Sequence, residues 1–169
     1  MTDEGTGADV TNLADLLGRT AARLGDAVAF VDAATGTQTT WAQLDLAVDR
    51  LAAGLRRDGL QPGDRVAMLL GNRVEFVATY LAVLRARMVC MPLNTGYTRH
   101  EVADLLARSG ARLLVADEAT EEVAVAAAPE GCAVAVVGDP SFENLSRLGS
   151  RADAQDAVDH GPTDPEQVA

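Results

Sequence analysis

The sequence predicts an α/β fold in which a mostly parallel, doubly wound sheet carries helices on both faces. Short apolar runs alternate with helical patterns of about ten to eighteen residues, an alternation typical of parallel strands joined by helical crossovers. The run at residues 65–70 is almost continuously apolar, as expected of a strand covered on both faces. Residues 59–93 then read as turn, strand, helix and strand, which is one right-handed parallel crossover.

The chain begins with a predicted helix and a predicted hairpin. Apolar residues at helical spacing over 13–24 indicate an amphipathic helix, with Thr11 or Asn12 as its N-cap. Residues 28–31 and 38–40 have the composition of short strands and are separated by a glycine-containing turn. We therefore expect an antiparallel hairpin after the first helix.

The second helix has the clearest pattern. Thr40 and Gln43 form a capping box at its start, and Gly59 follows its end. Its polar face should expose Asp45 and Asp49. The residues predicted to be buried are Leu44, Val48, Leu51 and Leu55.

The central crossover should place its helix directly on the sheet. Asn72 is the expected N-cap, so this helix should begin at about Arg73. The strand at 89–93 is expected to be buried like the strand at 65–70. The residues expected to face the sheet are Val74, Val77, Tyr80 or Leu81, and Leu84.

The same alternation continues after the central crossover. Thr98 and Glu101 form another capping box, and Gly110 should end that helix. The further expected elements are a strand at 112–116, a helix at 120–128, a strand at 133–137 and a short helix at 142–148. The predicted organisation is a disordered N-terminus at 1–11, an α/β subdomain at 12–148 and a polar linker or tail at 149–169.

Composition and charge exclude several classes of function. A net charge of −11 argues against nucleic acid or an anionic membrane as a partner, because both attract basic surfaces. All 14 basic residues are arginine, so this chain alone cannot complete a mechanism that needs a lysine. Cys90 and Cys132 lie in apolar surroundings and are expected to be reduced and buried. The N-terminus does not resemble a signal peptide, and no apolar run approaches the roughly 20 residues of a membrane span, so we expect a cytoplasmic protein.

The order of these segments resembles the N-terminal part of the AMP-forming acyl-CoA synthetases, also called acyl-adenylate-forming enzymes. The stretches that carry the resemblance are TTWAQLDLAVDRLAAGLRRDGLQPGDRVAMLLGNRVEFVATYLAVLRA and MVCMPLNTGYTRHEVADLLARSGARLLVAD. The opening NLADLLGRTAARLGDAVAFVD is similar as well. The motif PLNTGYT most closely resembles the sequences of members that use fatty or malonyl-type acids.

The resemblance implies a parent ligase that uses ATP and Mg²⁺ to turn a carboxylic acid into an acyl-adenylate and then transfers the acyl group to coenzyme A. In that family the phosphate-binding loop, the magnesium-binding glutamate and the catalytic lysine come from downstream segments. No residue of this sequence matches them, so we assign no catalytic, cofactor-binding or metal-binding residue. The chain alone is expected to bind neither ATP, Mg²⁺ nor coenzyme A, and to be inactive.

Two local features bear on the resemblance. Asn94 and Thr95 follow the carboxyl end of a predicted parallel strand, where open sheets place ligands, and are weak candidates for the substrate region; turn chemistry is the competing interpretation. The family usually has a glycine near the position of Arg87. Either Arg87 adopts a left-handed conformation at a cost of roughly 1 kcal/mol, or the helix runs one residue longer.

Two classes of function remain open at this point. The chain is either part of a split or truncated ligase, or a non-catalytic module that binds a protein partner or a small ligand. A ligase part should expose apolar side chains where its remainder docks or where it associates with itself, whereas an independent module should have a polar or self-paired sheet edge. An unrelated flavodoxin-like binder would need a phosphate loop after its first strand, and the sequence has none.

Overall fold

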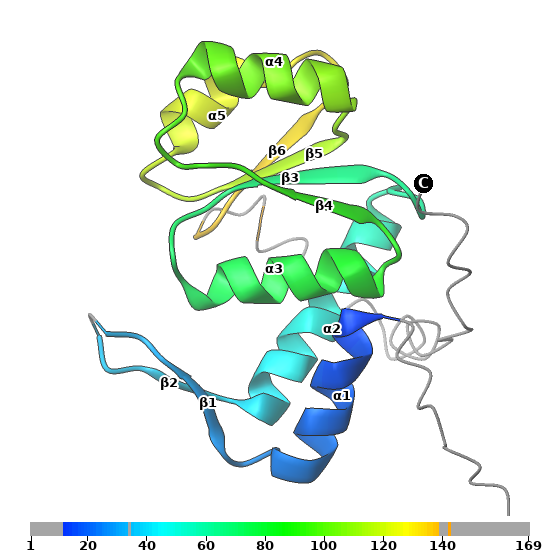
Figure 1. Ribbon diagram of the computed structural model, residues 1–169, viewed down its shortest axis with the longest axis vertical. Coiled ribbons are helices and arrows are strands. Elements are labelled where there is room, and N and C mark those ends of the chain that lie inside the picture. Colours follow the sequence, from blue (N-terminus) through cyan, green and yellow to red (C-terminus); the bar gives the residue numbers. More distant parts are fainter. Residues whose placement is uncertain (1–11, 34, 139–141, 143–169) are drawn as a thin grey trace, which may run out of the picture.

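A computed structural model describes residues 12–33, 35–138 and 142 of the chain (Figure 1). The helices are α1 (Leu13–Leu24), α2 (Trp41–Arg57), α3 (Val74–Arg85), α4 (Arg99–Ser109) and α5 (Glu121–Ala127). The strands are β1 (Val28–Val31), β2 (Gln38–Thr40), β3 (Arg65–Leu69), β4 (Val89–Pro92), β5 (Leu113–Ala116) and β6 (Ala133–Val136). Of the short helix expected at 142–148, only Phe142 lies within the described residues, and the predicted termini lie outside them.

The four strands β4-β3-β5-β6 form one sheet in that order, and every neighbouring pair is parallel. Helices cover both faces: α3 lies on one side and α4 and α5 on the other (Figure 1). This arrangement confirms the predicted fold class. The separate antiparallel hairpin of β1 and β2 confirms the second expectation.

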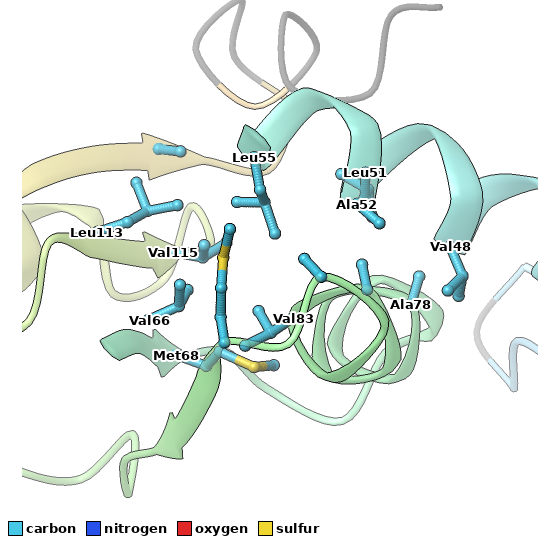
Figure 2. Close-up of a cluster of buried hydrophobic side chains, with 14 of the residues drawn as sticks. Val48, Leu51, Ala52, Leu55, Val66, Met68, Ala78, Val83, Leu113 and Val115 are labelled. Carbon is cyan, nitrogen blue, oxygen red and sulfur yellow. The ribbon is translucent and has the colours of Figure 1, made fainter. Parts of the chain in front are cut away.

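Alternation along the central strand divides the core into two layers. Val66 and Met68 point to the side of α2 and α3, whereas Ala67 and Leu69 point to the side of α4 and α5. Figure 2 shows the first layer, in which Leu55 of α2 and Val83 of α3 lie near Met68. All four residues predicted to form the buried stripe of α2 are buried.

Local capping chemistry fixes where several helices begin. In the capping box of α2, the Gln43 amide donates to Thr40 Oγ1 at 3.3 Å and the Thr40 amide donates to Gln43 Oε1 at 2.9 Å. Thr98 and Glu101 make the equivalent pair at the start of α4. Asn12 caps α1 through a 2.9 Å hydrogen bond from the Ala14 amide. These three N-termini agree with the sequence prediction.

The prediction for the central crossover was wrong in three details. The N-cap of α3 is Arg73, which makes no side-chain capping hydrogen bond, and not Asn72. The most buried apolar residues of α3 are Ala78, Ala82 and Val83, which the prediction omitted, whereas Val74, Val77, Tyr80 and Leu81 of the predicted stripe are half-buried against the same core layer. Small side chains face inward because α3 is enclosed between the sheet and α2 and must approach both closely (Figure 2). The third error concerns β4, which is an edge strand with Val89 42% exposed and not a buried strand.

Two further outcomes concern charged side chains. Arg87 has φ of 59°, so the left-handed alternative is the correct one and α3 does not run on. Asp45 and Asp49 do not simply face solvent, because both accept hydrogen bonds from the buried guanidinium of Arg85. An amphipathic pattern read from α2 alone could not reveal that α3 brings a cation to its polar face.

Helix α1 is only partly covered by the described chain. Ala14 and Leu17 are buried, whereas Leu13, Leu16 and Leu24 of the apolar stripe are exposed. Figure 1 shows α1, α2 and the hairpin on the side of the molecule farthest from α4 and α5. None of the helices within the described ranges combines the length and the hydropathy that a bilayer crossing requires.

Candidate functional site

The carboxyl ends of the four parallel strands meet at one edge of the sheet, which is where open α/β sheets bind ligands. Three loops at this edge carry polar side chains: Gly71–Arg73 after β3, Asn94–Tyr97 after β4 and Asp117–Thr120 after β5. Both residues predicted for the substrate region, Asn94 and Thr95, belong to this carboxyl edge.

Asn94 and Thr95 are exposed in the loop after β4. Asn94 Oδ1 accepts a hydrogen bond from the Gly96 amide at 2.8 Å, and the Asn94 carbonyl accepts one from the Tyr97 amide at 3.0 Å. Asn94 therefore closes a turn through its own side chain. Its contact with a substrate, and that of Thr95, stays a prediction.

Asp117 is the central polar group of the edge and is almost fully buried. Its Oδ2 accepts a 2.8 Å hydrogen bond from the Gly71 amide, and its Oδ1 accepts one from the Ala119 amide at 3.1 Å. The hydroxyl of Thr120 lies 3.0 Å from Oδ1 and 2.6 Å from the Leu69 carbonyl, which compete for its single proton. Asp117 and Thr120 together hold the loop after β5 against the end of β3.

The protonation of Asp117 follows from these contacts. Burial by itself raises the pKa of Asp117, but the hydrogen bonds from Gly71, Thr120 and Ala119 stabilise the carboxylate more strongly. The pKa of Asp117 is consequently lower than the usual 3.8, and the group is ionised at neutral pH. A carboxylate held by these hydrogen bonds suits a structural role better than proton transfer or metal binding.

A second link joins the same two loops at the surface. Arg73 Nη1 lies 2.7 Å from Glu118 Oε2, and Arg73 Nε lies 2.9 Å from Glu75 Oε2. Arg73 is thus held by one carboxylate of its own helix and one from the loop after β5. The loops after β3 and β5 are fixed to each other by one buried and one exposed contact.

The structure does not bring the predicted and the observed polar residues together, because β3 separates β4 from β5. Sequence reasoning missed Asp117, although a signal was present. An aspartate that directly follows an apolar strand and precedes a threonine by three residues is typical of a side-chain-closed turn before a helix.

The two thiols are free, as the sequence predicted, with Cys132 buried and Cys90 half-buried. Burial raises the pKa of Cys90 to about 12. Its Sγ lies 3.1 Å from Met68 Sδ, inside the core layer of α3. Cys90 is therefore a protonated, packing side chain and not an activated nucleophile.

Two hollows lie away from Asn94 and Thr95. One, of about 490 Å³, lies at the opposite edge of the sheet between the end of α4 and the turn Pro129–Gly131. The other, of about 280 Å³, lies between α2 and the first turns of α3, and we call it the α2–α3 groove. The residues that line the groove are Thr39, Leu44, Ala47, Arg50, Leu51, Val74, Glu75, Ala78 and Phe142.

The residues present do not fit ATP or Mg²⁺. Both oxygens of Asp117 already accept main-chain hydrogen bonds. Within residues 12–33, 35–138 and 142, no three acidic, histidine or cysteine side chains gather closely enough to hold a metal ion. The chain has no lysine that could bind a phosphate group. We derive no step through either group.

Similarity to known proteins covers most of the chain. A profile of the family described as "AMP-binding enzyme" matches residues 17–169. The 4-coumarate–CoA ligase 3 of rice is 37% identical over 123 residues, which are 72% of this chain and 22% of that protein. The long-chain-fatty-acid–CoA ligase FadD13 of Mycobacterium tuberculosis is 30% identical over 140 residues, which are 80% of this chain and 27% of that protein.

Solved structures of related proteins also match most of this chain. A benzoate CoA ligase from Burkholderia xenovorans matches 80% of this chain with a TM-score of 0.74 and 28% identity, and the match covers 28% of that chain. The N-terminal domain of FACL13 from Mycobacterium tuberculosis matches 82% of this chain with a TM-score of 0.75 and 26% identity, over 36% of that chain. This chain thus spans about a quarter of the curated relatives.

Proposed function

Because the chain belongs to the AMP-binding enzyme family, we propose that it serves as the N-terminal region of an AMP-forming acid–CoA ligase. The ligase would activate a carboxylic acid with ATP to an acyl-adenylate and pass the acyl group to coenzyme A. The observation that carries the proposal is the likeness of fold and sequence to the N-terminal part of acyl-CoA ligases, over four-fifths of this chain.

The chemistry of the described residues supports different roles for this region and for the remainder of a ligase. Bringing a carboxylate and the phosphates of ATP together requires cations and backbone donors aimed at the phosphate oxygens. In the described chain, Arg85, Arg73 and Arg65 are all engaged in structural contacts, and Asp117 is held by main-chain hydrogen bonds. We propose that this region supplies a rigid flank of the enzyme, with Asn94 and Thr95 near the acyl region, and that the remainder of a ligase supplies the catalytic groups.

The alternative function, a non-catalytic binding module, predicts a polar or self-paired sheet edge. Among the described residues, β4 instead lies at the edge of the sheet, where it exposes Val89 and leaves Cys90 and Met91 half-buried. An apolar edge of this kind supports the ligase proposal, since it calls for a covering partner.

The experiment that tests the proposal is ATP–pyrophosphate exchange with a panel of aromatic, fatty and dicarboxylic acids. One sample is this chain alone. The other is a chimera in which this chain replaces the N-terminal region of Mycobacterium tuberculosis FadD13 that it matches. We expect no exchange by the chain alone and acid-dependent exchange by the chimera. Exchange by the chain alone, or an inactive chimera beside an active parent enzyme, would refute the proposal.

A further inference from the structure

Arg50, which lines the α2–α3 groove, carries a polar atom that the described residues leave unsatisfied. Nε of Arg50 is buried, and no acceptor within residues 12–33, 35–138 and 142 reaches it. Buried side-chain donors in native proteins nearly always have a partner, so an isolated one calls for an explanation. A guanidinium nitrogen at the wall of a hollow calls for an acceptor that enters the hollow.

The rest of the groove determines what kind of group could enter. Most of its wall is apolar, formed by leucine, alanine, valine and phenylalanine side chains. The other charged residue of the lining, Glu75, is occupied by Arg73 at 2.9 Å. The groove therefore suits an acceptor, a carboxylate or a main-chain carbonyl, that is flanked by apolar side chains.

The path of the chain leads to the same place. Phe142 follows β6 in the sequence, is buried, and belongs both to the groove lining and to the core layer of α2 and α3. The polypeptide therefore reaches the groove within a few residues of the last strand of the sheet.

Exposed apolar side chains gather on the same half of the molecule. Nine large apolar residues of the described chain are exposed, and six of them belong to α1, the hairpin or α2. These six are Leu13, Leu16, Leu24, Val28, Val31 and Leu46. An amphipathic helix whose apolar stripe faces solvent is typical of a surface that another part of a protein covers.

We infer that the α2–α3 groove is the docking site for the remainder of the ligase, which places a hydrogen-bond acceptor against Arg50. The inference rests on the proposed function and specifies where the two parts meet. It places this contact on the α1–α2 half of the molecule. The remainder covers the exposed leucines of α1 and supplies an acceptor to Arg50 Nε, which has none among the described residues.

The test uses Arg50→Met, which removes the guanidinium but keeps a long apolar stem. Its control is Arg108→Met on α4, where the side chain is 78% exposed and pairs only weakly with Asp104, at 3.4 Å. Both substitutions are made in this chain alone and in the FadD13 chimera. Thermal unfolding is measured in both contexts, and ATP–pyrophosphate exchange in the chimera.

We expect Arg50→Met to leave the Tm of the isolated chain unchanged or higher, because no hydrogen bond is lost. In the chimera we expect the Tm to fall by about 3 °C or more and exchange to fall roughly tenfold, since a charge-assisted hydrogen bond is removed. Arg108→Met should change neither quantity in either context.

Three results would overturn the inference. An equal loss of Tm in both contexts would make Arg50 a structural residue of this chain. An active chimera that tolerates Arg50→Met would show that nothing docks against the guanidinium. Binding of benzoate to the isolated chain that Arg50→Met abolishes would make the groove a small-ligand site. An inactive chimera without substitutions would instead refute the proposed function.

Discussion

Substitution of Arg85 by methionine should destabilise this chain more than any single change at its carboxylate partners. The side chain is only 5% exposed and joins three helices. Its Nη2 lies 2.7 Å from Asp45 Oδ1, and its Nη1 lies 2.6 Å from Asp49 Oδ1, both on α2. Nη2 also donates to the Ala14 carbonyl of α1 at 3.1 Å.

The expected loss in the free energy of unfolding depends on whether water can solvate each carboxylate once the guanidinium of Arg85 is removed. Removing one member of a fully buried ion pair costs about 3–5 kcal/mol, because the other charge is left without compensation. Here the carboxylates of Asp45 and Asp49 are 26% and 43% exposed, so water can replace part of the lost contact. Methionine also fills most of the volume of the arginine stem. We therefore expect a loss of about 2–3 kcal/mol in the free energy of unfolding.

The matched control is Asp49→Asn, which removes the more exposed partner and leaves Arg85 paired with Asp45. Its cost should stay within about 1 kcal/mol, as for other exposed pairs. Urea denaturation followed by circular dichroism measures both changes. A loss below about 0.5 kcal/mol for Arg85→Met would refute the assignment of this network as the joint between α1, α2 and α3. A larger loss for Asp49→Asn than for Arg85→Met would do the same.

Three further predictions concern single positions. Arg87→Gly should raise the free energy of unfolding by about 1 kcal/mol in thermal unfolding, because φ of 59° suits glycine, and an unchanged Tm would contradict a strained arginine. Thr79→Val should raise stability by about 1 kcal/mol by removing a buried hydroxyl without a partner among the described residues, whereas Thr79→Ser, which keeps the hydroxyl, should not. Asp117 has a native pKa below the usual 3.8, so its stabilisation is complete above that pH and is lost as pH falls through the native pKa. Asp117→Asn should therefore cost about 1–3 kcal/mol at pH 7 and flatten the acid limb of a stability–pH profile; an unchanged limb would rule out this role.

Local chemistry explains which parts of the fold could be predicted from the sequence. Thr40 with Gln43, and Thr98 with Glu101, define helix starts through contacts three residues apart, and both occur in the structure. The buried β3 strand was evident from its continuous apolar run, because a strand covered on both faces needs no alternation. Such features depend on residues close in the sequence, so no knowledge of the tertiary arrangement was needed.

The incorrect predictions concern features that depend on residues far apart in the sequence. Helix α3 is apolar on most of its surface, so periodicity could not decide whether Val77 or Ala78 faces inward. Strand β4 has an apolar sequence but lies at the edge, and its position depends on the order of strands, which no single segment encodes. For the candidate site, the sequence placed Asn94 and Thr95 after the carboxyl end of a parallel strand, where the structure has them, because this is a local feature; their contact with a substrate stays a prediction. It could not show that Asp117 binds the Gly71 amide, a contact between residues 46 positions apart.

Arg85 and Arg50 show why a charge pattern alone does not reveal function. Both are arginines on the helices that pack against one face of the sheet, and in the sequence both lie among apolar residues. Arg85 forms ion pairs with two carboxylates and donates a hydrogen bond to a main-chain carbonyl, and all three partners belong to this chain. Arg50 has a buried Nε without an acceptor among the described residues, and its side chain lines a hollow together with Phe142. A cation whose partners are all internal stabilises a fold, whereas a buried donor without an acceptor among the described residues, beside an exposed apolar surface, agrees with the proposed contact with the remainder of a ligase.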